Sequence, residues 1–263
     1  MSLVFAAISP HPPLLIPSIG KENIKEVEKT KKSLLKLEEA MYLARPDIIV
    51  LISPHGSYFS DAFTINVSPN FHTDLTQFGD LETKIEFKGE MNLSSRLREC
   101  GKDENIPITM ISEPKLDHGS SVPLYYLAQH LIGTSILPIG FCSLDWKTHV
   151  EFGYLIKDAI SQINKRVAVI ASGDLSHALK TEAPAGYNAA GEEFDTAIRE
   201  LLQSNNTVGM LNLNKKFVED AAECGFRSIL ILMGILRNIN SRYQEYSYEG
   251  PYGVGYLVSN FII

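Results

Sequence analysis

Four of the seven histidines lie in the segments just beyond apolar stretches where a strand is expected to end. His11 and His55 both lie in a Ser-Pro-His sequence, His118 lies in Asp-His-Gly, and His177 lies in Gly-Asp-Leu-Ser-His. Imidazole is the commonest neutral metal ligand in proteins and the side chain that exchanges protons near neutral pH. These four histidines are therefore candidates for one site that binds a metal and moves protons.

A carboxylate would complete such a site, because two histidines and one carboxylate on one face of an iron(II) ion leave positions open for oxygen chemistry. Glu223 is our candidate, since small residues and Gly225 bracket it before an apolar helix. A glutamate in this place could instead cap that helix. Asp117 and Asp174 lie close in sequence to two of the histidines and could fix imidazole tautomers from a second shell.

Apolar, β-branched segments predict the strands that would carry these residues. They are Leu3–Ile8, Asp47–Ile52, Ile108–Ile111, Ser135–Ile139 and Arg166–Ala171. Helical patterns lie between and after them, at Lys21–Ala44, Ser121–Leu131, Val150–Ile163, Glu192–Leu202 and Ser228–Asn238. This alternation predicts a single-domain α/β fold with a largely parallel or mixed central sheet and helices on both faces. In such folds the carboxyl ends of the strands form the ligand crevice, so the histidine loops should converge there.

Two segments depart from this alternation. Ala62–Phe87 has alternating apolar positions among turn residues, which predicts an antiparallel insertion. Gly250–Gly255 is rich in glycine but precedes an expected terminal strand, and a phosphate loop needs a helix N-terminus behind it.

Composition narrows the classes of partner. The formal net charge is −7 and the chain has no basic tract, which argues against nucleic acid and anionic membrane surfaces. The three cysteines, Cys100, Cys142 and Cys224, form no metal or redox pair by spacing and do not resemble a secreted disulfide framework. No segment approaches a membrane span and no basic leader is evident. We therefore expect a cytoplasmic protein that acts on a small molecule.

With these motifs in order, the sequence resembles the LigB-type class III extradiol ring-cleavage dioxygenases. The resemblance extends from Ser9-Pro10-His11 to the segment Gly250–Tyr256. It implies a single LigB-type catalytic domain over residues 1–263. It also implies a non-haem iron(II) ion and cleavage of a catechol- or aminophenol-type ring with O2.

Matched motif by motif, the resemblance implies roles for the candidate residues. His11, His55 and Glu223 would bind the iron. His177 would be the base that assists deprotonation of the substrate, and His118 would donate a hydrogen bond or a proton toward bound oxygen species.

Two segments, Gly173–Ala178 and Gly225–Ser228, resemble in particular the branch related to Memo proteins. Proteins of that branch share the fold but carry a cysteine near the late carboxylate position. Here Cys224 follows Glu223 directly, so a shift of one residue would change the third ligand. We favour Glu223, because iron(II) oxygenase sites use a carboxylate.

Other functions remain compatible with these residues. A Memo-like metal-binding, redox or ligand-binding protein would keep the pocket without ring cleavage, and a zinc hydrolase could use the same two histidines and glutamate to activate water. The resemblance further implies a homodimer, a small second subunit or an AMMECR-type protein as partner.

Overall fold

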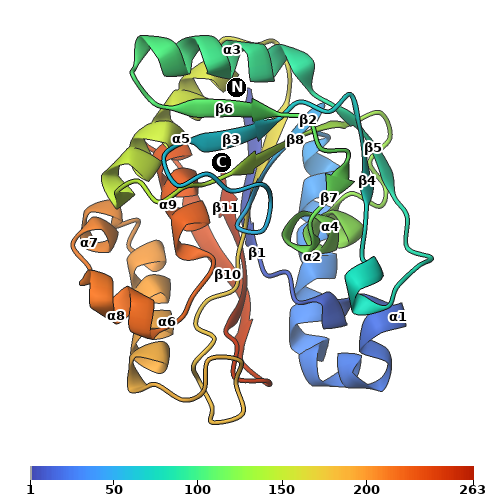
Figure 1. The fold of residues 1–263 in the computed structure, drawn as a ribbon, viewed down its shortest axis with the longest axis vertical. Helices are drawn as coiled ribbons and strands as arrows, with labels where there is room; N and C mark the ends of the chain where they lie inside the picture. Colours follow the sequence, from blue (N-terminus) through green and yellow to red (C-terminus); the bar gives the residue numbers. More distant parts are fainter. Residues whose placement is uncertain (1) are drawn as a thin grey trace.

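The computed structural model describes residues 2–263, which form one eleven-stranded sheet with helices on both faces (Figure 1). Its centre is built from β1 (Leu3–Ser9), β9 (Val167–Ser172), β2 (Ile48–Ser53) and β8 (Ser135–Gly140), which are parallel neighbours in that order. On the outer side of β1, β11 (Tyr256–Ile262) and β10 (Arg242–Glu249) add antiparallel strands.

The sheet branches at β8. Its shorter strands are β3 (Phe63–Asn66), β4 (Asn70–Thr73), β5 (Glu86–Gly89), β6 (Ile108–Ile111) and β7 (Lys115–Leu116). β8 pairs with β3 on one branch and with β5 on the other. The predicted antiparallel insertion is found only in part: β4–β5 and β3–β8 are antiparallel, whereas β3–β6, β4–β7 and β5–β8 are parallel.

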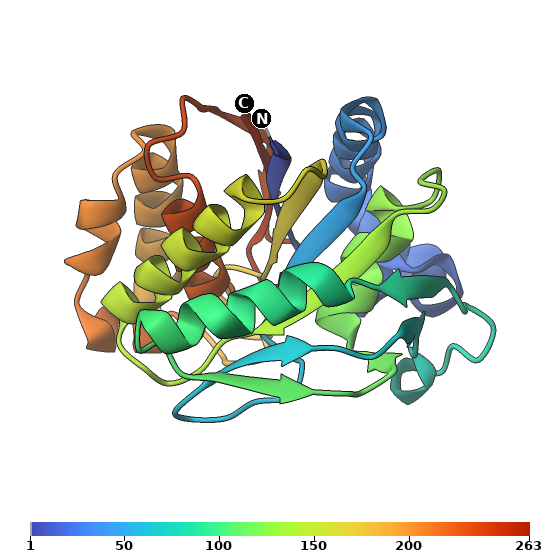
Figure 2. The same ribbon diagram turned by 90° about the horizontal axis from the view of Figure 1, so that it is seen from above.

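Two hydrophobic cores lie on the two faces of the sheet, because successive strand residues point to opposite faces. One core receives Ala6 and Ile8 of β1, and the other receives Phe5 and Ala7. The first is covered by α3 (Met91–Asp103), α5 (Trp146–Ser161), α6 (Ala189–Gln203) and α9 (Phe226–Ile235), and the second by α2 (Glu28–Ala44) and α4 (His118–Leu127). Figure 2 shows α2 and α4 on one side of the sheet and α5, α6 and α9 on the other.

Short elements complete the chain. They are η1 (Pro13–Leu15), α1 (Pro17–Gly20), η2 (Lys21–Val27), η3 (Thr76–Phe78), α7 (Thr207–Leu211) and α8 (Lys215–Asp220). Within residues 2–263 there is no helix long and apolar enough to cross a membrane.

The predicted α/β fold class, with a mixed sheet between helices, is confirmed. The five predicted strands are present, each within one residue of its expected ends. The helix expected at Ser121–Leu131 begins earlier, at His118, because the side chain of Asp117 accepts the backbone N–H of Ser120 and caps it. This early start places His118 at the carboxyl end of the central strands.

Candidate metal centre

Three of the predicted histidines meet at the carboxyl end of the central strands. His11 follows β1, His55 follows β2, and His118 is the first residue of α4. The Nε2 atoms of His11 and His55 are 3.0 Å apart. The ring of His118 stacks on that of His55, with centroids 4.1 Å apart, and lies 5.4 Å from that of His11. The convergence expected for these loops is therefore present.

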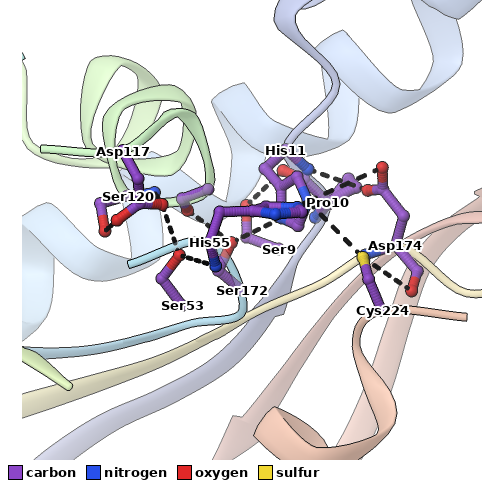
Figure 3. Close-up of polar contacts among 11 residues, drawn as sticks. Ser9, Pro10, His11, Ser53, His55, Asp117, Ser120, Ser172, Asp174 and Cys224 are labelled. Atoms are coloured by element: carbon purple, nitrogen blue, oxygen red, sulfur yellow. Dashed lines mark hydrogen bonds and ion pairs between the residues drawn. The ribbon is translucent and has the colours of Figure 1, made fainter. Parts of the chain in front are cut away.

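Asp174 and Cys224 lie on the other side of His11 (Figure 3). Asp174 is in the loop after β9, and Cys224 is in the turn between α8 and α9. The Sγ atom of Cys224 is 3.6 Å from His11 Nε2, and Asp174 Oδ2 is 4.0 Å from the same nitrogen. Potential ligand atoms thus form two triads that share His11, one with His55 and His118 and one with Asp174 and Cys224.

A close approach of two glycines brings Asp174 and Cys224 together. A Cβ atom on Gly173 would lie 2.1 Å from the Cα of Gly225, so side chains at this crossing would separate the two loops. The N–H groups of Cys224 and Gly225 donate to the carbonyl of Asp174 at 3.4 and 3.0 Å. In return, the N–H of Asp174 donates to the Cys224 sulfur at 3.3 Å.

Glu223, the predicted third ligand, is directed elsewhere. Ala222 has a φ of 51°, and this left-handed residue turns the chain just before Glu223. The carboxylate then accepts the N–H of Phe226 at 2.5 Å, at the start of α9. The structure therefore does not bring Glu223 to the histidines, and the neighbouring Cys224 lies there instead.

Hydrogen bonding fixes the tautomer of His11. The hydroxyl of Ser172 donates to the carbonyl of Gly119 at 2.5 Å, so its oxygen accepts from His11 Nδ1 at 2.8 Å. With its proton on Nδ1, His11 presents the lone pair of Nε2 to the cluster, as a metal ligand must. Ser172 was not among the residues predicted from the sequence. It ends β9 directly beside Ser9 of β1, but only the register of the two strands reveals that position.

Asp117 and Asp174 were both expected to orient imidazoles. Within the described residues, Asp117 accepts instead from the hydroxyl of Ser53 at 2.5 Å and from the N–H and hydroxyl of Ser120 at 3.0 and 2.9 Å. It ties the loop after β2 to α4. Asp174 accepts the backbone N–H of His11 at 3.0 Å, so it fixes the His11 loop while its second oxygen faces the imidazole.

Burial favours the neutral forms of the groups in the cluster. Burial, followed by the neighbouring histidines, lowers the pKa of His11 well below its usual value, and burial and His118 lower the pKa of His55 to about 4. Both imidazoles are therefore neutral at pH 7, as ligands must be. Burial raises the pKa of Asp174 to about 7 and raises the pKa of the Cys224 thiol. A divalent ion would favour the charged form of both groups.

A cavity of about 610 Å³ lies against this cluster. Its polar lining includes His177, whose pKa is lowered by burial, so the fourth predicted histidine faces the same space as the other three. The apolar part of its lining includes Pro12, Pro13, Leu14, Tyr252, Val254 and Tyr256. The four predicted histidines and Asp174 thus share one cavity, whereas Asp117 and Glu223 do not line it.

Comparisons with known proteins show which family and which relatives the chain resembles. The family described as "Catalytic LigB subunit of aromatic ring-opening dioxygenase" matches residues 5–259. A Clostridium acetobutylicum protein whose name states no activity is 33% identical over 98% of this chain. The 3,4-dihydroxyphenylacetate 2,3-dioxygenase of Escherichia coli is 29% identical over 55% of the chain, and a MEMO1 family protein of Methanococcoides burtonii is 24% identical over 85% of the chain and 87% of that protein.

The chain spans 57% of the Clostridium protein and 51% of the Escherichia coli dioxygenase, so it corresponds to little more than half of each. Among solved structures, an uncharacterised protein of Escherichia coli K12 shares the fold. The TM-score is 0.68 at 18% identity, and the match covers 99% of this chain and 100% of that protein.

Proposed function

The chain belongs to the family of LigB-type catalytic subunits of aromatic ring-opening dioxygenases, and on that premise we propose that it opens a catechol- or aminophenol-type ring with O2 at a non-haem iron(II) ion. One observation carries this proposal: two neutral imidazole nitrogens lie 3.0 Å apart beside a cavity with apolar walls. Two such nitrogens bound to one ion at ~2.1 Å each would also lie roughly 3 Å apart. The donor set therefore suits a divalent metal.

We propose His11, His55 and Asp174 as the ligands of the iron, with Asp174 in place of Glu223. Asp174 is the carboxylate beside His11, and two histidines with one carboxylate leave positions open for other ligands. When bound, the iron would supply open coordination positions for the two adjacent ring substituents of the substrate and the redox chemistry needed with O2.

The remaining histidines are suited to moving the phenolic proton. The product has the formula of the substrate plus O2, so a proton taken from a ring hydroxyl must be returned. His177 lines the cavity with a pKa lowered by burial, which leaves its imidazole neutral and able to accept that proton. The imidazolium formed at His177 holds that proton and can return it, while His118, neutral and stacked on His55, would donate a hydrogen bond to the reacting oxygen atoms. The prolines and tyrosines around them would hold the ring and exclude water.

Nitric oxide tests this proposal, because it occupies the oxygen position on iron(II). Protein loaded with iron(II) without air should give a near-stoichiometric high-spin iron–nitrosyl signal in electron paramagnetic resonance, and adding a catechol should change that signal. A protein that retains no iron, or a signal that catechols and aminophenols leave unchanged, would refute the ring-opening proposal.

Cys224 favours a second candidate, a Memo-like protein that binds a metal but does not cleave rings. Its sulfur is closer to His11 Nε2 than Asp174 Oδ2 is, at 3.6 against 4.0 Å. Thiolate ligands favour softer ions such as zinc or copper(I) over iron(II).

Two near-isosteric variants separate these candidates. Under the iron proposal, Asp174→Asn should weaken iron(II) binding by more than about 100-fold, since it removes a ligand rather than an outer partner, while Cys224→Ser should stay close to wild type. Under the Memo-like alternative the order of the two variants is reversed, and Cys224→Ser is the one that weakens metal binding. Metal titration of both variants, with circular dichroism to verify folding, gives the answer.

A further inference from the structure

A second buried carboxylate lies behind the metal centre, on a helix that contributes no candidate ligand. Asp195 of α6 is 1% exposed. Its Oδ1 accepts the backbone N–H of Ser176 at 2.8 Å, and its Oδ2 accepts the hydroxyl of Tyr248 at 2.6 Å. A buried carboxylate is costly to keep, and burial raises the pKa of Asp195 to about 6. Its hydrogen bonds offset part of that cost.

Ser176 lies in the loop that carries two site residues, Asp174 and His177. The hydroxyl of Ser176 donates to the carbonyl of Ala221 at 2.8 Å, and the N–H of His177 donates to the same carbonyl at 3.1 Å. Ala221 begins the turn that presents Cys224. Asp195 thus accepts a hydrogen bond from Ser176, the residue that joins the Asp174–His177 loop to the Cys224 turn.

The turn before β11 closes the other side of this loop. Leu175 N–H donates to the Gly255 carbonyl, and Gly255 N–H donates to the Ser176 carbonyl, both at 2.8 Å. A Cβ atom on Gly255 would lie 2.1 Å from Asp195 Oδ2. Glycine is therefore required if the carboxylate is to stay against the loop.

A surface ion pair holds the far end of this chain of contacts. Arg199 makes two hydrogen bonds to Glu245, at 2.8 and 2.9 Å, and its guanidinium lies 4.5 Å from the centre of the Tyr248 ring. Tyr248 in turn bonds to Asp195. The carboxylate is thus held in one place by α6 and β10 together.

We propose that Asp195 is a positioning residue of the metal centre, whose carboxylate holds the Asp174–His177 loop against the Cys224 turn through the N–H of Ser176. This inference rests on the proposed metal site but adds a residue that touches neither metal nor substrate. Without the carboxylate, the N–H of Ser176 is buried with no acceptor, and the loop relaxes to satisfy it. Asp174 and His177 then leave their positions relative to His11.

Cobalt(II) binding tests the effect on the site, because its visible spectrum reports the ligands and their geometry. Asp195→Ala should weaken cobalt(II) binding by about 10- to 100-fold, as expected for the loss of an outer partner, and should change the spectrum. Asp195→Asn retains an acceptor oxygen for Ser176 and should restore most of the affinity. Tyr248→Phe, which removes only the other hydrogen bond of the carboxylate, should bind cobalt(II) within about threefold of wild type.

A metal-free measurement keeps this inference separate from the proposed function. Alkylation of Cys224, followed by mass spectrometry with Cys100 as internal reference, should be about tenfold faster in Asp195→Ala, because its loop no longer covers the sulfur. If wild type binds neither cobalt nor iron, the proposed function fails, while the alkylation rates still decide the role of Asp195.

Three results would overturn the positioning role. One is an Asp195→Ala variant with wild-type affinity, spectrum and alkylation rate, even if it were less stable. Another is a loss of cobalt(II) affinity in Asp195→Asn that is as large as the loss in Asp195→Ala. If the alanine variant does not fold, hydrogen exchange of the wild type decides: a Ser176 amide that exchanges as fast as exposed loop amides refutes the inference, and a protected one supports it.

Discussion

The two halves of the metal centre are built in different ways. His11 and His55 each follow a central parallel strand within two residues, in the same Ser-Pro-His sequence. Asp174 also lies two residues beyond a central strand, β9, but His177 lies further along that loop and Cys224 lies in a separate turn far along the chain. The first half is fixed by the sheet alone, whereas the second half also needs contacts between this loop and the Cys224 turn.

This difference determines how each half should respond to change. The backbone of the first half continues from strands that are fully hydrogen-bonded, so a substitution there removes a ligand and leaves the surroundings intact. The second half depends on the glycine crossing of Gly173 and Gly225 and on a left-handed residue, Ala222. A substitution at those positions moves several site residues at once.

The largest effect is expected in the first half. His11→Ala removes the nitrogen that both triads share, so metal affinity should fall by well over about 100-fold, more than the loss of an outer partner costs. Metal titration measures it, with His72→Ala, at a half-exposed strand position, as the control. The unfolding midpoint without metal should also fall, because the variant loses a buried imidazole and its hydrogen bond to Ser172. A metal-binding His11→Ala variant would show that the second half holds the ion alone.

Gly173→Ala tests the second half without touching a ligand. Its Cβ would meet the Cα of Gly225, and such overpacking costs about 1–3 kcal/mol. Because relief of that contact separates Asp174 from Cys224, metal affinity should fall by about 10- to 100-fold. Urea unfolding and metal titration measure the two effects. Gly186→Ala is the control. Gly186 has open space around it but a positive φ of 74°, so this substitution adds backbone strain away from the site. Equal losses of metal affinity in both variants would contradict the role of the crossing.

The same difference explains what could be predicted from the sequence. His11, His55 and the strands before them follow from local patterns, because apolar segments and prolines determine where a strand ends. His118 and His177 were assigned to the same cavity for that reason. Whether Glu223 or Cys224 faces the site depends on the positive φ of Ala222 and on the packing of Gly173 against Gly225, two glycines that are far apart in the sequence. The role of Ser172 could not be predicted because it depends on the strand register. The role of Asp195 could not be predicted because it depends on a helix far along the chain.

Ser172→Ala removes support from the first half rather than a ligand. Without the hydroxyl, His11 Nδ1 has no acceptor and the imidazole is free to change tautomer or rotate. Metal affinity should fall by about tenfold, the lower end of what outer partners contribute. Ser172→Thr keeps the hydroxyl and is the matched variant. If Ser172→Thr lost as much metal affinity as Ser172→Ala, the effect would come from packing and not from the hydrogen bond.

The smallest effect is expected at Glu223, and it tests the division between the halves most directly. Because its carboxylate accepts the N–H of Phe226 at the start of α9, Glu223→Ala should cost about 0.5–2 kcal/mol of stability, as for other helix caps. Metal affinity should remain close to that of wild type, whereas Asp174→Asn should lower it. Urea unfolding and metal titration on the same samples separate the two effects. If Glu223→Ala instead lost the metal, the turn after Ala222 would rotate on metal binding, and the second half of the centre would be set by the metal rather than by the contacts between its loops.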